Sequence, residues 1–418
     1  MCEMKDSGIE WIGNIPNGWH IEKGKYCFTS KKEIPGIYSG KYKRLALTLR
    51  GVVDRSKDDA EGLQPKDFNT YQLLRENELV FKLIDLQNAS TSRVGLSHST
   101  GLVSPAYIIL RTNEKIVPSY AEKFYLMMWH RKIFNVLGDN GVRSNLGVSD
   151  LLNVPISVPP ICEQKRIADF LDSKCSEIDA ISADIQKEIE TLEQYKRSVI
   201  TEAVTKGVNP DVEMKDSGVQ WIGKIPANWT CIKGKYILKY MQKQVKPNDG
   251  VITCFRDGEV TLRSNRREDG FTMADKEIGY QGIDAGDLVV HGMDGFAGAI
   301  GISDSRGKAS PVLNVLDSRQ DKKYIMYYLR SMAYGDVFAA LATGIRVRSC
   351  DLRWNKLSEL LYPVPSLEEQ AEIVKYIEDT LKKANAVIGE KKQQLDVLDS
   401  YKKSLIYEYV TGKKEVLV

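Results

Sequence analysis

Two long stretches of the chain, residues 159–208 and 365–412, carry apolar residues at intervals of three, four and seven, the spacing of a coiled-coil seam. No glycine or proline interrupts residues 161–206, and Gly389 interrupts the second stretch. Each stretch predicts a helix of about 45 residues, roughly 65 Å long. Because a lone helix with one apolar seam is not stable, we expect the helices to pair with each other or with a partner.

The stretches ahead of these helices have a different pattern. Residues 1–158 and 209–364 contain short β-rich runs, such as LVFKLID and DLVV, separated by Gly, Ser and Asn turns. A helical segment with aromatic residues on one face follows in each, SYAEKFYLMMWHRKIF and then KKYIMYYLRSM. Each part ends at prolines, which favour a helix start. The pattern predicts an α+β protein with two mixed α/β globules, two long helices and a tail at 413–418.

The chain repeats itself over half its length. Residues 4–26 and 214–236 are identical at 15 of 23 positions, beginning MKDSGIEWIGNIP and MKDSGVQWIGKIP. Glu-Gln recurs at 163–164 and 369–370, and LEQYKRSVITEAVT at 192–205 matches LDSYKKSLIYEYVT at 398–411. A repeat of this length indicates duplicated domains and excludes a short-period solenoid.

Chain order sets the direction in which the helices pair. The first helix ends where the second globule begins, so the second helix can pack along the first only by running back. We therefore expect an antiparallel pair related by a pseudo-twofold axis, with a globule at each end. The MKDSG segment follows one helix and lies where the other returns, which predicts an apolar cap docked on each helix end. The alternative is a flap on a strand edge of the globule.

Composition narrows the class of protein. The chain is 42% hydrophobic and 28% charged, as is usual for globular domains, and has no apolar run of membrane-spanning length. It shows no secretory signal, and its seven cysteines form no CxxC pair, so we expect reduced thiols and a cytoplasmic protein. The net charge is only +3, so a DNA-binding surface must be local.

Catalytic motifs are missing from the sequence. There is no Asn/Asp-Pro-Pro-Tyr/Phe motif of an adenine methyltransferase, and GIYSGKY at 36–42 is one spacer short of a P-loop. PDVEMK at 210–215 resembles a nuclease motif, but its acidic residues are crowded in a linker. The four histidines lack zinc-ligand spacing. We predict no catalytic or metal site and no cofactor in this chain.

Two copies of KDSGxxWIGxIPxxW, each followed by a variable globule, a P-x-x-EQ helix start and a YKxSxIxExVT helix end, resemble the specificity (S) subunit of Type I restriction–modification systems. The resemblance covers essentially the whole chain. It implies that residues 1–158 and 209–364 are target recognition domains, each reading one half of a split, asymmetric DNA sequence. It implies that the helices, 159–208 and 365–412, space these domains and bind two methyltransferase (M) subunits. Restriction/translocase (R) subunits join in the full complex, and S-adenosylmethionine, ATP and Mg belong to the partner subunits.

Reading double-stranded DNA requires Arg, Asn or Gln at base edges and Lys or Arg at phosphates. Basic loops supply such residues in both globules, and a Gly-x-Arg element recurs just before each helix approach. In the first globule the predicted DNA-binding residues are Lys41, Lys43, Arg44, Arg55, Ser92, Arg93, Arg143 and Asn145. In the second they are Arg256, Arg263, Arg266, Arg267, His291, Arg306, Lys308, Arg346 and Arg348. For each of them, a solvated surface charge is the alternative.

Apolar residues outside the predicted seam indicate a partner-binding surface on the helices. The residues are Ile181, Tyr195, Ile200, Val374, Tyr401 and Ile406. Ordinary broadening of the seam is the alternative interpretation. For the whole chain, two other classes remain beside the DNA-specificity subunit: a single-chain nuclease or methyltransferase, and a coiled-coil scaffold that binds no nucleic acid.

Overall fold

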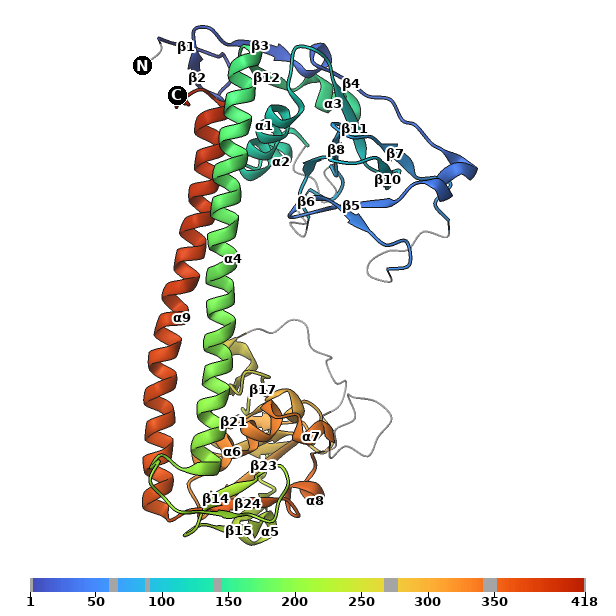
Figure 1. Ribbon diagram of the computed structural model, residues 1–418. Coiled ribbons are helices and arrows are strands. Elements are labelled where there is room, and N and C mark those ends of the chain that lie inside the picture. The colour runs from blue at the N-terminus through green and yellow to red at the C-terminus, as the bar shows by residue number, and fades with distance from the viewer. Residues whose placement is uncertain are drawn as a thin grey trace. The chain divides into compact units, whose positions relative to one another are not determined.

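The computed structural model describes residues 3–59, 67–86, 91–138, 145–266, 277–340 and 352–416. The chain folds as two compact units, each containing parts of both long helices (Figure 1). Unit 1 comprises Met1–Ile185 with Gln393–Val418, and unit 2 comprises Gln186–Lys392. The domain boundaries predicted from the sequence lie at the ends of the long helices, whereas the two units divide within these helices. The predicted boundaries stay predictions.

The long helices are α4, Ile161–Lys206, and α9, Leu367–Val410, with 46 and 44 residues, which confirms the predicted length. The Glu-Gln pair of the repeat lies in the first turn of each helix. The buried Gln164 side chain donates to the carbonyl of Pro159 at 2.8 Å, and Gln370 donates to that of Pro365 at 3.0 Å. Both helices end at a glycine with positive φ, Gly207 and Gly412, as left-handed C-caps do.

The two helices run antiparallel within each unit. In unit 1 the rings of Phe170 and Tyr409 lie 4.6 Å apart, and one turn or more along the pair Lys402 Nζ contacts Asp179 at 2.6 Å. In unit 2 Glu188 pairs with Lys391. The predicted seam is buried at most of its positions: Leu171, Cys175, Ile178, Ile185, Ile189, Val199, Ala203, Ile377, Ala384, Ile388 and Leu405.

The globular part of unit 1 is built on two four-stranded sheets. One has the order β6-β5-β10-β7 and the other β4-β11-β8-β9. Helix α1, Pro118–His130, packs its aromatic face into the core, which confirms the predicted amphipathic helix. The sheet strands are β4 Phe28–Thr29, β5 Arg44–Thr48, β6 Gly51–Arg55, β7 Gln72–Leu74, β8 Leu79–Phe81, β9 Val94–Leu96, β10 Gly101–Val103 and β11 Ile108–Thr112. The remaining elements are β1 Met4–Asp6, β2 Asn14–Pro16, β3 His20–Lys23, β12 Pro155–Val158, α2 Ile133–Leu137, α3 Val148–Asn153 and the 3-10 turns η1 Gly24–Tyr26 and η2 Gly36–Lys41.

Unit 2 has one four-stranded sheet, β16-β23-β20-β21, and several two-stranded ladders. Helix α6, Lys322–Tyr334, fills the place that α1 fills in unit 1. The strands are β13 Met214–Asp216, β14 Lys224–Pro226, β15 Thr230–Lys233, β16 Leu238–Met241, β17 Ile252–Cys254, β18 Val260–Leu262, β19 Gln281–Ile283, β20 Leu288–His291, β21 Ile300–Ile302, β22 Gly307–Ala309, β23 Leu313–Ser318 and β24 Leu361–Val364. The short helices are α5 Gly234–Ile237, α7 Val337–Ala340, α8 Trp354–Leu357, η3 Arg263–Asn265 and η4 Gly295–Ala297.

The repeated segment caps a helix end in each unit, as the sequence predicts. Ile12, Ile15 and Trp19 share a core with the last turns of α9. Trp229 and its apolar neighbours share a core with the last turns of α4. A buried tyrosine of the globule completes each joint: Tyr120 donates to the carbonyl of Val410 at 3.1 Å, and Tyr324 to that of Val204 at 3.1 Å. Across the described ranges, no helix combines the length and apolar character of a membrane span.

Candidate nucleic-acid interface

The basic residues around the β5–β6 hairpin of unit 1 differ in their availability. Lys43 is paired with Asp54 at 2.7 Å, and Arg55 with Asp59 at 2.8 Å. Arg44 is buried, and its guanidinium lies over the ring of Phe68. Lys41 is exposed at the end of η2 above the Tyr38 ring, and no described carboxylate pairs with it. Lys41 is therefore the most available cation of this group.

Arg93 and Ser92, predicted as DNA-binding residues of a loop, are buried. The Arg93 guanidinium donates to the carbonyls of Ile84 at 3.3 Å and Asp85 at 2.6 Å, and burial lowers its pKa. Exposed Asn145 accepts a hydrogen bond from the Asp85 N–H at 3.1 Å. In this geometry Arg93 supports the backbone around Asp85, and Asn145 remains the residue that solvent reaches.

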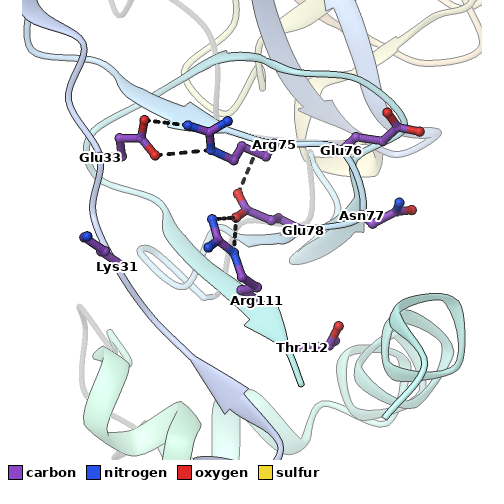
Figure 2. Close-up of a pocket in the computed structure, with 8 residues that line it drawn as sticks. All are labelled: Lys31, Glu33, Arg75, Glu76, Asn77, Glu78, Arg111 and Thr112. Carbon is purple, nitrogen blue, oxygen red and sulfur yellow. Dashed lines mark hydrogen bonds and ion pairs between the residues drawn. The ribbon is translucent and has the colours of Figure 1, made fainter. Parts of the chain in front are cut away.

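A polar pocket of about 480 Å³ in unit 1 was not anticipated from the sequence (Figure 2). Its charges alternate: Arg75 donates twice to Glu33, and Arg111 donates twice to the buried carboxylate of Glu78. Lys31 is exposed at its edge, apart from these pairs in Figure 2. The acids and bases balance, so the pocket offers hydrogen bonds more than net charge. No sequence signal marks it, because its arginines are isolated along the chain.

Most of the predicted cations that are described in unit 2 are held by carboxylates. Arg306 pairs with Asp249 at 2.8 Å and Asp284 at 2.6 Å, and these carboxylates raise its pKa. The hydrogen bonds from Lys243 and Arg306 lower the pKa of Asp284 to about 2. Lys308 is paired with Glu277 at 2.7 Å. This cluster fastens β22 to its neighbours, and its charge is largely used inside the protein.

The other predicted residues that the structure describes in unit 2 are also engaged. Arg266 pairs with Asp257 and Glu259 and lies over the Phe255 ring, while Arg263 donates to the Thr253 hydroxyl at 3.3 Å. Exposed Arg256 pairs with Asp294 at 2.9 Å. His291 accepts from the Asp294 N–H at 2.9 Å, and burial lowers its pKa, which keeps it neutral near pH 7.

A second pocket that sequence reasoning missed lies in unit 2 and has a volume of about 680 Å³. Four cations line it, Lys196, Arg197, Arg256 and Arg330, against three carboxylates. The guanidinium groups of Arg197 and Arg330 both lie over the ring of Tyr334, at 5.4 and 5.8 Å. Lys196 is paired with Glu193 at 2.8 Å and Arg256 with Asp294, so the charges of this pocket are largely balanced. Arg143, Arg267, Arg346 and Arg348 lie outside the described residues, as does the loop at 87–90, and they stay predictions.

The helix residues predicted to bind partners divide into two sets. Ile181, Tyr195 and Tyr401 are about half exposed. The expected exposure is wrong for Ile200, Val374 and Ile406, which are at most 6% exposed. The globules cover them: Ile200 and Val374 belong to the core around Trp229, and Ile406 to the core around Trp19. They serve the joint between helix and globule.

Comparison with known proteins places this architecture. A family model described as "Type I restriction modification DNA specificity domain" matches residues 19–191. The putative Type I restriction enzyme MjaX specificity subunit of Methanocaldococcus jannaschii is 24% identical, covering 97% of this chain and 96% of its own. Over nearly its whole length, the chain is similar to specificity subunits of Type I restriction–modification systems.

Two further matches agree with this family. The MjaVIII specificity subunit of the same organism is 25% identical over 82% of this chain and 80% of its own. A chain from a structural study of complex assembly and conformational transition of the type I R-M system has a TM-score of 0.68 at 13% identity. It covers 96% of this chain and 99% of its own, so the folds agree over nearly their full lengths. These relatives are named as specificity subunits of restriction enzymes, in agreement with the predicted recognition role. Within the described ranges, no cluster of His, Cys, Asp and Glu could hold a metal ion.

Proposed function

We propose that each unit reads one half of a bipartite, asymmetric DNA target. The observation that supports this most strongly is the contrast between a repeated scaffold and unrepeated basic surfaces. Tyr120 and Tyr324 make corresponding hydrogen bonds in the two units. Lys41 and the β5–β6 hairpin of unit 1 have no counterpart of the same sequence in unit 2, where β18 and η3 carry the LRSNRR cluster. Two similar folds with different surface donors are suited to two different base sequences.

The same proposal assigns two methyltransferase subunits to the helices. Ile181 and Tyr401 are exposed in unit 1, and Val387 and Tyr195 are exposed in unit 2. Each of the four directly precedes a position that continues the three-four spacing of the seam. These positions are Ser182, Lys196, Ile388 and Lys402. The four exposed residues therefore lie on the same edge of their helices. In an antiparallel pair these edges flank each other, so each unit offers one apolar and aromatic pair. Two equal surfaces suit two copies of one partner.

The full complex supplies the chemistry in this proposal. Restriction/translocase subunits join the methyltransferase subunits on the cytoplasmic DNA, and S-adenosylmethionine, ATP and Mg²⁺ are bound by those partners. This chain contributes sequence choice and the gap between the half-sites. Methylation profiling of a genome that carries the system tests the target: two short sequences separated by unread base pairs are expected, and methylation at one continuous sequence would contradict the proposal.

The helices are expected to set that gap. Inserting one heptad between Ile185 and Leu192 and another between Lys391 and Leu398 keeps the seam in phase and lengthens each helix by about 10 Å. The preferred gap should then grow by up to about three base pairs at 3.4 Å per pair, with both half-sequences unchanged. A three-residue insertion at the same two places is the matched control, because it breaks the seam. If the heptad variant assembles and still selects the original gap, the helices do not measure it.

A further inference from the structure

A Lys-Gly-Lys-Tyr turn is repeated on the surfaces of both units, at residues 23–26 and 233–236. The four residues have the same burial in both copies: the lysines and the tyrosine are exposed, and the glycine is buried. Tyr26 is 54% exposed and Tyr236 is 74% exposed. A large aromatic side chain at the surface twice, at the same position of a duplicated scaffold, requires an explanation.

Folding accounts for the glycine. Gly24 donates to the carbonyl of Val154 at 2.9 Å, and Gly234 donates to that of Leu360 at 2.9 Å. A Cβ atom at Gly24 would lie 3.1 Å from the Leu151 carbonyl oxygen, and at Gly234 it would meet the carbonyl of Leu357. The turn therefore needs glycine for its close approach to the backbone of α3 in unit 1 and of α8 in unit 2.

Folding does not account for the tyrosine. The ring of Tyr26 is covered by Lys25 Nζ at 5.1 Å, and that of Tyr236 by Lys235 Nζ at 5.5 Å. Neither hydroxyl has a hydrogen bond to another described residue. Exposed neighbours in the same repeated segment have diverged: Asn17 corresponds to Ala227, and His20 to Thr230. The tyrosine and its lysines stayed while unconstrained surface positions changed.

The retained surface must contact something that is the same at both units. Two half-sites of an asymmetric target differ in their bases, so base readout is excluded; phosphates or two copies of one protein remain. The charge around the two Lys-Gly-Lys-Tyr turns distinguishes a phosphate ligand from a protein partner. In unit 2 Glu359 pairs with Lys233 at 2.7 Å and Lys235 at 3.0 Å. By strand register Asn153 holds the equivalent place in unit 1, and no described carboxylate pairs with Lys23 or Lys25.

We infer that each Lys-Gly-Lys-Tyr surface docks one copy of the same protein partner, the methyltransferase subunit, with the tyrosine as its anchor. This inference rests on the proposed function. The aromatic ring and the lysine stems are common to both units, whereas the net positive charge is not, and a phosphate ligand would depend on that charge. Tyrosine is a frequent energetic centre of protein interfaces because it buries a rigid ring and keeps a polar end. The partner is expected to offer a shallow apolar pocket with a hydrogen-bond acceptor at its rim.

The test compares Tyr26→Ala, Tyr236→Ala and the double variant by native mass spectrometry and titration with the methyltransferase subunit of the same system. Each single variant should bind one of two partner copies about tenfold more weakly, and the double variant both copies. Tyr38→Ala is the matched control, since Tyr38 is 58% exposed under Lys41 Nζ and is not repeated in unit 2. Unchanged thermal unfolding establishes that the variants are folded.

Three outcomes separate the possibilities. Two copies bound at wild-type affinity by both single variants would overturn the inference and leave the proposed function standing. Failure of the wild-type chain to bind any methyltransferase subunit would remove the proposed function itself. Full partner binding with weaker binding to all DNA sequences and a lower salt dependence would identify phosphate as the ligand and reject the protein partner.

Discussion

Trp19 and Trp229 hold the same position in the two units, but their surroundings differ. Trp229 Nε1 donates to Glu369 Oε1 at 2.9 Å, whereas Trp19 Nε1 is buried with no acceptor among the described residues. The glutamate equivalent to Glu369 is Glu163, which is likewise partly exposed but makes no hydrogen bond to Trp19. Conversely, there is less room beside the helix-ending glycine in unit 1, where an added Cβ at Gly412 would meet Pro16 and the Trp19 ring, than beside Gly207 in unit 2. The duplicated joint is thus held by hydrogen bonding in unit 2 and by tighter packing in unit 1.

The largest difference is expected at the helix-ending glycines. Both have φ near +70°, so an alanine at either one costs about 1–2 kcal/mol of backbone strain. At Gly412 the new Cβ would also lie 2.6 Å from Pro16 Cγ and 3.2 Å from the Trp19 ring, whereas at Gly207 its nearest neighbour is the Trp229 ring at 3.4 Å. Overpacking of this kind adds roughly 1–3 kcal/mol.

Gly412→Ala should therefore destabilise unit 1 by about 2–5 kcal/mol, and Gly207→Ala should destabilise unit 2 by about 1–2 kcal/mol. Hydrogen exchange followed by mass spectrometry on peptides from each unit measures the two separately. Gly389→Ala is the control, because nothing lies within 4 Å of a Cβ there. Equal losses in both units would show that the packing difference has no energetic weight.

The hydrogen bond of Trp229 gives the next effect. Glu369→Ala leaves a buried N–H without an acceptor, which costs about 1–3 kcal/mol. Glu163→Ala removes a partly exposed side chain that makes no such bond, so less than about 0.5 kcal/mol is expected. Glu369→Gln keeps an oxygen acceptor and should recover most of the loss. The comparison fails if Glu163→Ala destabilises unit 1 as much as Glu369→Ala destabilises unit 2.

Sequence periodicity and the internal repeat were enough to predict the helices, their antiparallel pairing and the capped helix ends. These features depend on local spacing and on residues that recur. Which basic side chains are paired with carboxylates was not predictable, because the partners are remote in the chain. Arg306 reads as part of a basic SRGK run, yet Asp249 and Asp284, 57 and 22 residues away, neutralise it.

The prediction that Ile200, Val374 and Ile406 are exposed was wrong for a related reason. A heptad pattern reports only the face that one helix shows to the other. Each globule also packs against a helix end. It does so through residues of the repeated cap and of α1 or α6, which the heptad pattern does not report. Ile181, Tyr195 and Tyr401 lie away from those joints and remain exposed, so their predicted role depends on a partner.

The smallest of these differences concerns acid sensitivity. His130, at the end of α1, has a buried Nδ1 without a hydrogen-bond partner among the described residues. Burial and the nearby Lys403 and Lys402 lower its pKa to about 4, and Asp399 opposes this shift. Tyr334 ends α6 at the equivalent place in unit 2. An unfolded histidine takes up a proton below pH 6.5, while the folded one resists until about pH 4. The neutral ring therefore contributes stability that is complete above pH 6.5 and is lost as the pH falls toward 4.

Between pH 7 and pH 5, unit 1 of the wild-type chain should lose about 1–2 kcal/mol more than unit 1 of His130→Tyr, by unit-resolved hydrogen exchange. Unit 2, which lacks this histidine, serves as the internal control and should show the same pH dependence in both proteins. Equal slopes for unit 1 in the two proteins would mean that His130 is not the group that titrates.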